Sequence, residues 1–387
     1  MKKLVLVAAA ALTCSSLASA QSSTVSVYAR VDNGVRTLNG NSNGQSADVY
    51  HSALGGSRWG LSGNHDLGNG MKAGAVLEGQ ILSDVGGTAT GKTFDRQSFV
   101  YLSEEKWGTV KLGRDNTFGL DALFSGALDV AGLLDGARSH STYVGTSTTV
   151  GAVDAYGPNP LTTLYSSARG TRRLDNVVKY TNTAGDFNYG LAYAFGETVG
   201  DIKASSTQNA SLGYKKDKLT AVTTYQSTND PTNKKMDIWN LGGRYNFGQI
   251  SAVAAYHILS ADAGYNPSSS PTSPEYFKDV LTGTGAGAKE GKVHVSNIGM
   301  VYNVKPQWTY TLSYYNVDQK EGVKVGKVDS YITHLQYDMN KYVSLYGIID
   351  YQKAKDGLKS TVAGYTGGDQ LGFTAGIRVM FDASKSF

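Results

Sequence analysis

The chain has 387 residues, of which 40% are hydrophobic, 47 are glycine and 7 are proline, and its formal net charge is +4 at pH 7. This charge is too small to indicate a nucleic-acid partner, because such proteins neutralise many phosphates. Beyond the N-terminal segment no apolar run reaches about eighteen residues, which excludes a membrane protein built from helices.

The N-terminal segment has the three parts of a secretory signal peptide. Lys2 and Lys3 supply positive charge, Leu4–Leu12 is an apolar run, and Ala18–Ala20 is a small-residue cleavage pattern. The apolar run is too short to cross a bilayer of about 30 Å as a helix. The sequence therefore predicts a signal peptide over residues 1–20 that is removed after Ala20.

The mature chain, residues 21–387, is predicted to be one β-rich domain without disulfides. The only cysteine, Cys14, lies in the signal peptide. Tyrosine is abundant, with 25 residues against 11 phenylalanines, and the mean hydropathy is −0.27. No stretch of the mature chain has the composition of a linker between domains.

Apolar and polar residues alternate along the mature chain, which is typical of strands with one apolar and one polar face. In the segment 187–195 the apolar series is Phe187, Tyr189, Leu191, Tyr193 and Phe195, with small or polar residues between them. The same pattern recurs and predicts sixteen strands, near 24–37, 47–65, 70–84, 93–104, 107–116, 171–182, 185–197, 206–216, 217–228, 236–247, 248–260, 291–304, 306–317, 328–338, 341–353 and 369–381.

Three features favour a membrane barrel over a soluble sandwich. Aromatic residues gather at the ends of the apolar faces, as at Tyr180, Phe247, Trp308 and Tyr337, where barrels carry interfacial girdles. The polar faces carry Gly, Ser, Thr and Asn, which suit a wet lumen. Short and long connections alternate, as in outer-membrane barrels. The predicted fold is therefore an all-β, sixteen-stranded antiparallel transmembrane β-barrel, wide enough to enclose water.

Several motifs together are specific for one family. The chain resembles the Gram-negative general-diffusion porins, and most closely their β-proteobacterial branch. The matching segments are Val27–Asp32, Gly56–Gly63, Asp66–Ala73, Arg96–Val100, Gly108–Arg114 and Arg173–Asn176 with Tyr180.

This resemblance implies an outer-membrane homotrimer, surrounded by lipid and lipopolysaccharide, that lets small hydrophilic solutes and ions diffuse through a water-filled pore. It implies that the third external loop, near 117–150, folds inward and constricts the lumen. It also implies a last strand that ends on an aromatic assembly signal. Here that strand reaches Phe381, but the chain continues to Phe387, so either aromatic residue could serve.

Strand parity predicts which charges face the lumen. The outward residues are expected to be Trp59, Leu61, Ala73, Ala75, Leu77, Phe99, Tyr101, Leu174, Val178 and Tyr180. The residues left facing inward are Arg30, Asp32, Arg58, Lys72, Glu78, Arg96, Arg173 and Lys179. Arg114 has outward parity and is expected at a subunit contact.

The resemblance implies roles for some of these charges. Arg58, Arg96 and Arg173 match the basic wall of the porin constriction, and Glu78 and Asp121 match its acidic side. With Arg30 and Lys72 they form the expected pore constriction, which holds more cations than carboxylates. Rings of Arg or Lys select anions, so the pore is expected to prefer anions. Alternatively, the arginines only brace the inward loop through its carboxylates.

Other functional classes have less support. An outer-membrane enzyme would need a histidine beside a nucleophile or carboxylate, and the six histidines share no motif: His51, His65, His140, His257, His294 and His334. A sugar-specific pore would need an aromatic track, and the inward tyrosines are scattered: Tyr28, Tyr315, Tyr342 and Tyr346. External loops such as 260–290 could serve binding or adhesion. No metal or cofactor motif is present.

Overall fold

The structure is a computed structural model. It describes residues 22–41, 44–88, 92–129, 161–164, 172–267, 281–359 and 368–386. The expected signal peptide, Phe387, His140 and the larger part of the expected inward loop lie outside these residues. No helix among the described residues is both long and apolar enough to cross a membrane.

The described chain is almost entirely strand. The strands are β1 (Ser23–Asn41), β2 (Gly44–His51), β3 (Arg58–Gly68), β4 (Met71–Leu82), β5 (Gly87–Thr88), β6 (Gln97–Glu104), β7 (Gly108–Asn116), β8 (Arg173–Ala184), β9 (Phe187–Ala194), β10 (Thr207–Lys216), β11 (Leu219–Asn229), β12 (Lys235–Asn246), β13 (Ile250–Ala261), β14 (Gly291–Lys305), β15 (Trp308–Glu321), β16 (Gly326–Asp338), β17 (Val343–Asp356) and β18 (Asp369–Ser386). The short helices are α1 (Phe118–Phe124), α3 (Leu161–Leu164) and the 3₁₀ turn η6 (Gly285–Gly287).

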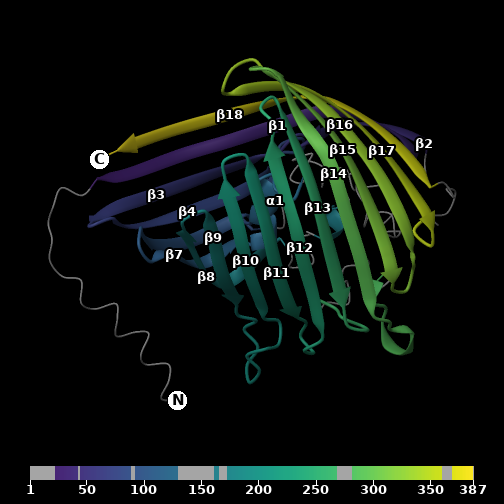
Figure 1. Ribbon diagram of the computed structural model, residues 1–387, viewed down its shortest axis with the longest axis horizontal. Helices are drawn as coiled ribbons and strands as arrows, with labels where there is room; N and C mark the ends of the chain where they lie inside the picture. Colours follow the sequence, from purple (N-terminus) through teal and green to yellow (C-terminus); the bar gives the residue numbers. More distant parts are fainter. Residues whose placement is uncertain are drawn as a thin grey trace.

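These strands form one closed antiparallel sheet (Figure 1). β1 pairs with β18 from Thr24 opposite Ser386 to Asn39 opposite Leu371, which closes the barrel. β2 and β3 both pair with β1 and are two parts of one wall strand, and the two-residue β5 pairs with the end of β4. Counted in this way the barrel has sixteen strands, so the prediction is confirmed. β18 also continues past Phe381 as paired strand, which places Asp382–Ser386 in the barrel wall.

The wall strand predicted at 47–65 is interrupted in the structure. Between β2 and β3 the chain leaves the sheet at Ser52–Ser57, and its residues are buried. The Asp32 carboxylate accepts hydrogen bonds from the backbone N–H groups of Leu54 and Gly55, at 3.0 and 2.6 Å. A buried carboxylate needs such donors, and alternation along the strand does not reveal them. We call Ser52–Ser57 the inner shelf.

The polarity of the two faces is inverted relative to a soluble protein. On β12 the outward Trp239 and Leu241 are exposed, whereas the inward Asn240 is buried. On β13 exposed and buried residues alternate from Ile250 onward. An apolar outside and a polar inside are the properties of a transmembrane barrel.

Two expected orientations on β6 are wrong. Phe99 and Tyr101 face the lumen, because Phe99 is buried under the Lys111 ammonium, 4.4 Å from the ring centroid, and Tyr101 lies opposite Lys111. Their neighbours Val100 and Leu102 are the exposed ones. All four residues are apolar, so alternation could not assign their faces.

Leu174 was expected to face outward, but it is buried beside Val177 and Ala194. A bulge in the pairing of β7 with β8 causes this difference. Gly113 pairs with Val177 and Asp115 with Leu174, so the two strands advance by different numbers of residues. Such a bulge changes the parity of the residues beyond it.

Candidate functional site: the charged wall of the lumen

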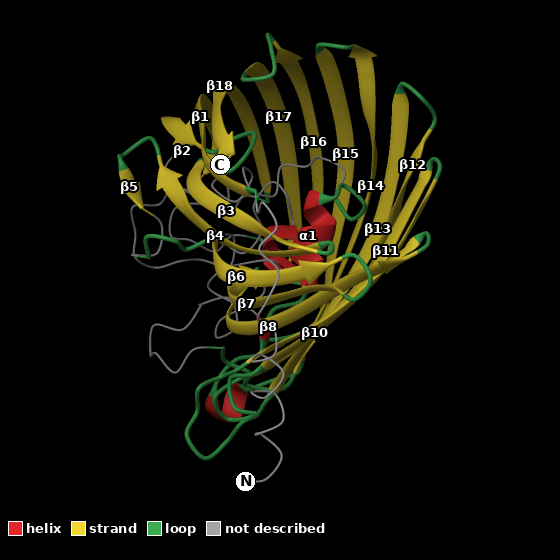
Figure 2. Cartoon of the chain, turned by 90° about the vertical axis from the view of Figure 1, so that its left-hand side faces the viewer, coloured by secondary structure: helices red, strands yellow, loops and turns green. Residues whose placement is uncertain are grey.

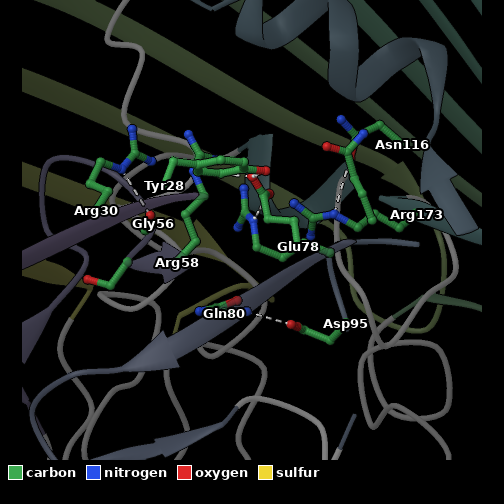
Figure 3. Close-up of polar contacts among 12 residues, drawn as sticks. Tyr28, Arg30, Gly56, Arg58, Glu78, Gln80, Asp95, Asn116 and Arg173 are labelled. Carbon is green, nitrogen blue, oxygen red and sulfur yellow. Dashed lines mark hydrogen bonds and ion pairs between the residues drawn. The ribbon is translucent and has the colours of Figure 1, made fainter. Parts of the chain in front are cut away.

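A group of opposite charges meets on the inner wall at Glu78 of β4. The Arg96 Nε atom donates a hydrogen bond of 2.5 Å to Glu78, and the Arg58 Nε atom lies 3.7 Å from the same carboxylate. The Tyr28 hydroxyl donates a second hydrogen bond, of 3.0 Å. Figure 3 shows Tyr28 and Arg58 beside Glu78. We call Tyr28, Arg58, Glu78 and Arg96 the Glu78 cluster.

Strand register places the cluster. Tyr28, Gly60 and Glu78 lie opposite one another on β1, β3 and β4, so they point to one face. Neighbouring strands are about 4.8 Å apart, and Tyr28 can reach Glu78 because Gly60 has no side chain. An added Cβ at Gly60 would overlap the Tyr28 ring.

The next row along these strands adds a third arginine. Arg30, Arg58 and Gln80 are direct partners on β1, β3 and β4. The Arg30 Nε atom donates a 3.0 Å hydrogen bond to the Gly56 carbonyl oxygen of the inner shelf. The backbone N–H of Gln80 donates a 2.8 Å hydrogen bond to the Asp95 carboxylate. The shelf therefore positions Arg30 beside Arg58.

Arg173 joins a second network on β7, β8 and α1. Its Nε atom donates to the Asn116 side-chain oxygen at 3.1 Å, and the Asn116 amide donates to Asp121 at 2.9 Å. Lys179 Nζ donates to Asp121 at 2.6 Å and lies 3.2 Å from Asp115. Lys179 and Asp115 are almost fully buried, whereas the Asp121 side chain is 42% exposed. Lys179–Asp115 is therefore the buried ion pair of this network, and breaking it leaves unpaired charge.

α1 lies inside the barrel (Figure 2). Thr117 caps its N-terminus by accepting the Leu120 N–H, and the Asn209 side chain on β10 accepts the Phe118 N–H at 2.7 Å. Phe118 fits over Gly190, where an added Cβ would overlap its ring. The chain thus turns from β7 directly onto the inner wall.

The segment after α1 then reaches β14 and β15. The Leu128 carbonyl oxygen accepts a 3.0 Å bond from Asn297, and the Tyr315 hydroxyl donates a 2.5 Å bond to Asp129. Seven strands, β8 to β14, separate β7 from β15 in the sheet. Between these ends it contacts β9, β10 and β12, so Thr117–Asp129 runs along the inner wall from β7 to β15. We call it the crossing segment.

The structure brings together most, but not all, of the expected constriction residues. Arg30, Arg58, Arg96 and Glu78 lie in adjacent rows, and Gln97, which is opposite Glu78, donates a 2.6 Å bond to Asp115 of the Arg173 network. The remaining residue, Lys72, is exposed near the start of β4 and pairs with Ser103 and Asp66. Six residues of strand, about 20 Å, separate it from Glu78.

The charges in these rows do not cancel. Four guanidinium groups, from Arg30, Arg58, Arg96 and Arg173, lie near three carboxylates, Glu78, Asp32 and Asp95, which leaves an excess of one positive charge. Lys111 and Lys179 are matched by Asp115 and Asp121. The Debye length of about 8 Å at physiological salt lets such charges act across a narrow pore.

Several residues of these polar networks were not predicted from the sequence. Asp115 and Asn116 follow the bulge, where parity gives no assignment. The lumen tyrosines do not form an aromatic track for a sugar, because each hydroxyl donates a hydrogen bond to a different carboxylate. Tyr28 donates to Glu78, Tyr315 to Asp129 and Tyr346 to Asp32. Outside the lumen, Arg114 forms a 2.6 Å ion pair with Asp175.

Comparison with known proteins agrees with this geometry. A family model described as Gram-negative porin matches residues 6–357. The outer membrane porin protein 32 of Delftia acidovorans is 30% identical over 411 residues, covering 97% of this chain and 99% of that protein.

Solved structures have the same fold. An anion-selective porin from Comamonas acidovorans superposes with a TM-score of 0.70 at 25% identity, covering 93% of this chain and 100% of that one. OmpT of Vibrio cholerae, in a structure described as its trimer form, has a TM-score of 0.61 at 13% identity, with 93% and 99% coverage.

Proposed function

Since the chain belongs to the Gram-negative porin family, whose members are channels and not enzymes, we propose that it forms an anion-preferring pore for passive diffusion across the outer membrane. The Glu78 cluster, Arg30, Arg173 and the crossing segment with Asp121 would form its constriction. The observation that supports this proposal is that arginines outnumber carboxylates in adjacent rows of the lumen wall.

Electrostatics supports this preference. A guanidinium group keeps its positive charge at any working pH, and a fixed positive field favours the entry of anions over cations. The crossing segment supports a narrow point at this level because it occupies part of the interior. The anion-selective Comamonas porin provides independent support by analogy.

Zero-current potentials across a planar bilayer would test the proposal. With KCl at two concentrations, an anion-preferring pore gives a potential of the sign set by chloride. The matched variants are Arg58→Gln in the cluster and Lys305→Gln at the exposed end of β14. We expect R58Q to reduce the preference and K305Q to leave it unchanged. A cation-preferring wild-type pore would contradict the proposal.

We further propose that the mature protein is a homotrimer whose subunits meet through β1–β7. In the described part of this sector the strongly exposed large apolar side chains are mostly aliphatic, for example Val27, Val35, Val100 and Leu112. From β8 onward they include many aromatic residues: Phe187, Tyr189, Phe195, Trp239, Tyr245, Phe247, Tyr256, Tyr331, Tyr342, Phe373 and Phe381.

Aromatic girdles lie where a barrel meets the lipid–water interface, so a sector with few exposed aromatic residues suits contact with protein. The aromatic sector would face outer-membrane lipid and lipopolysaccharide. Maturation would remove residues 1–20. Electrophoresis of unheated protein should show a trimer band, and N-terminal sequencing of the mature protein should begin at Gln21. A monomer at all temperatures below unfolding would contradict the trimer.

A further inference from the structure

A second group of cations lies on the inner wall away from the Glu78 cluster. Lys215 on β10 is the direct partner of Thr220 on β11, and Thr220 is the direct partner of Arg244 on β12. Cross-strand partners point to the same face. Lys215 shares its face with Asn209, which holds α1, so this face is the lumen. We call Lys215, Thr220 and Arg244 the lower row.

The lower row lies on the short-turn side of the crossing segment. Arg244 is close to the end of β12 at Asn246, beyond which a short turn leads to β13. A Cβ added at Gly126 would be 2.9 Å from the Arg244 guanidinium, so Arg244 lies against the crossing segment. One row further along β12, Gly242 contacts the same segment, with an added Cβ 2.8 Å from Leu128.

A cavity of about 550 Å³ opens beside the lower row. Lys215 and Thr220 line it, together with Ser125 of the crossing segment and wall residues that carry hydroxyl groups, such as Thr181 and Ser211. Two carboxylates also line the cavity. Asp121 is already paired with Lys179, and Glu105 lies in the turn between β6 and β7.

The cations of the lower row differ from the arginines of the Glu78 cluster in one respect. Arg58 and Arg96 share a carboxylate, whereas the side chains of Lys215 and Arg244 have no hydrogen-bond or ion-pair partner within the part of the chain that the structure describes. Two strand spacings place their backbones about 10 Å apart, with the Thr220 hydroxyl between them. Both long side chains can therefore close on one small anion.

We propose that Lys215, Thr220 and Arg244 form a binding site for a small oxyanion, on the short-turn side of the crossing segment. Arg244 can donate two parallel hydrogen bonds to an oxyanion, Lys215 supplies a point charge and Thr220 a hydroxyl donor. This proposal rests on the proposed function as an anion-preferring pore. The site would bind a permeating anion at a second position in the lumen, beyond the constriction. Inorganic phosphate is a suitable probe.

Block of chloride current by phosphate tests the site. Single pores are recorded in KCl while potassium phosphate is added to both compartments at constant ionic strength. We expect phosphate to reduce the wild-type current, and we expect R244Q and K215Q each to raise the half-blocking concentration about fivefold to tenfold, as for loss of one charge-assisted contact. The charge-preserving variant R244K should retain most of the block and shows whether the strand tolerates substitution.

Lys216→Gln is the matched control. Lys216 is the next residue on β10, points to the opposite face and has an exposed 3.5 Å ion pair with Asp186, which contributes little to stability. K216Q removes the same charge and should leave the phosphate block unchanged.

Equal block in wild type, R244Q and K216Q would overturn the lower-row site, as would a wild-type pore that prefers anions but is not blocked by phosphate. A wild-type pore without anion preference would instead contradict the proposed function. Migration of unheated protein on gels verifies that each variant is folded.

Discussion

The hydroxyl of Tyr346 on β17 donates a 2.6 Å hydrogen bond to the Asp32 carboxylate on β1, although β18 lies between these strands. The bond passes over Gly376, where any side chain would overlap the Tyr346 ring. The same carboxylate accepts the N–H groups of Leu54 and Gly55. Asp32 thus joins the strands at the closure of the barrel to the inner shelf, which in turn holds Arg30.

Tyr346→Phe removes one donor from this buried carboxylate. Hydrogen bonds to charged groups contribute about 1.5–3 kcal/mol, so we expect the free energy of unfolding to fall by about that amount. Urea unfolding in detergent, followed by the shift between folded and unfolded bands, measures it. Tyr342→Phe, in the exposed turn before β17, is the control, and equal stability of the two variants would refute the role of the bond.

Gly372→Ala should disturb a buried ion pair at the same closure. Arg36 donates to both Asp350 oxygens at 2.7 and 2.9 Å, and a Cβ at Gly372 would be 2.7 Å from that carboxylate and would overlap the guanidinium. Overpacking of this kind costs about 1–3 kcal/mol. Gly347→Ala is the matched control on β17, because its added Cβ comes no nearer than 4.0 Å to its neighbours. A lower melting temperature for G372A alone is expected, and equal melting of both variants would count against this packing.

Glu78→Gln should strengthen the preference for anions. The substitution removes the carboxylate that Arg58 and Arg96 share while keeping the shape of the side chain. We expect the zero-current potential in a KCl gradient to move further toward that of an ideal anion-selective pore. Glu197→Gln, in the exposed connection after β9, removes an equal charge and should have no effect. An unchanged potential in E78Q would show that these residues lie outside the constriction.

Lys179→Met should loosen the crossing segment. Lys179 pairs with both Asp121 and Asp115, and removal of one partner from a buried ion pair costs about 3–5 kcal/mol. We expect frequent current steps in single-pore recordings as well as lower stability. Reduced stability with wild-type current noise would indicate a role in the wall alone. Restoring neutrality with K179M/D121N should partly rescue the stability.

Low pH should release the external connection at residues 195–206. The Asn233 amide at 2.5 Å, with the backbone N–H groups of Lys203 and Ala204, lowers the pKa of Asp201. A lowered pKa means that the contact is fully present above the unfolded-state value of about 3.9 and is lost as pH falls through the folded-state value. The hydrogen-exchange protection factor of this connection, which corrects for the intrinsic pH dependence of exchange, should therefore fall only below about pH 4. Asp201→Asn should lower the protection factor at neutral pH as well, and a wild-type protection factor that does not change with pH would contradict this role.

The sequence alone determined the architecture, because the physical cause is local and repeated. Each strand shows apolar and polar residues in alternation and aromatic residues at the ends of its apolar face, and short and long connections alternate between strands. These features together define a membrane barrel. It also assigned Arg58 and Glu78 to the lumen face, because Trp59, Leu61 and Leu77 fix the parity of their strands. Arg58, Glu78 and Arg96 do meet in the structure.

Tertiary structure decided the rest, since it depends on contacts between residues distant in sequence. The inner shelf is held by hydrogen bonds from its backbone N–H groups to Asp32. The face of Phe99 is set by strand register, and the face of Leu174 by a bulge. The Tyr346–Asp32 bond needs the barrel to close with a glycine between two strands. The lower row appears only when the register sets Lys215, Thr220 and Arg244 side by side, because a cross-strand row is a property of pairing and not of any single strand.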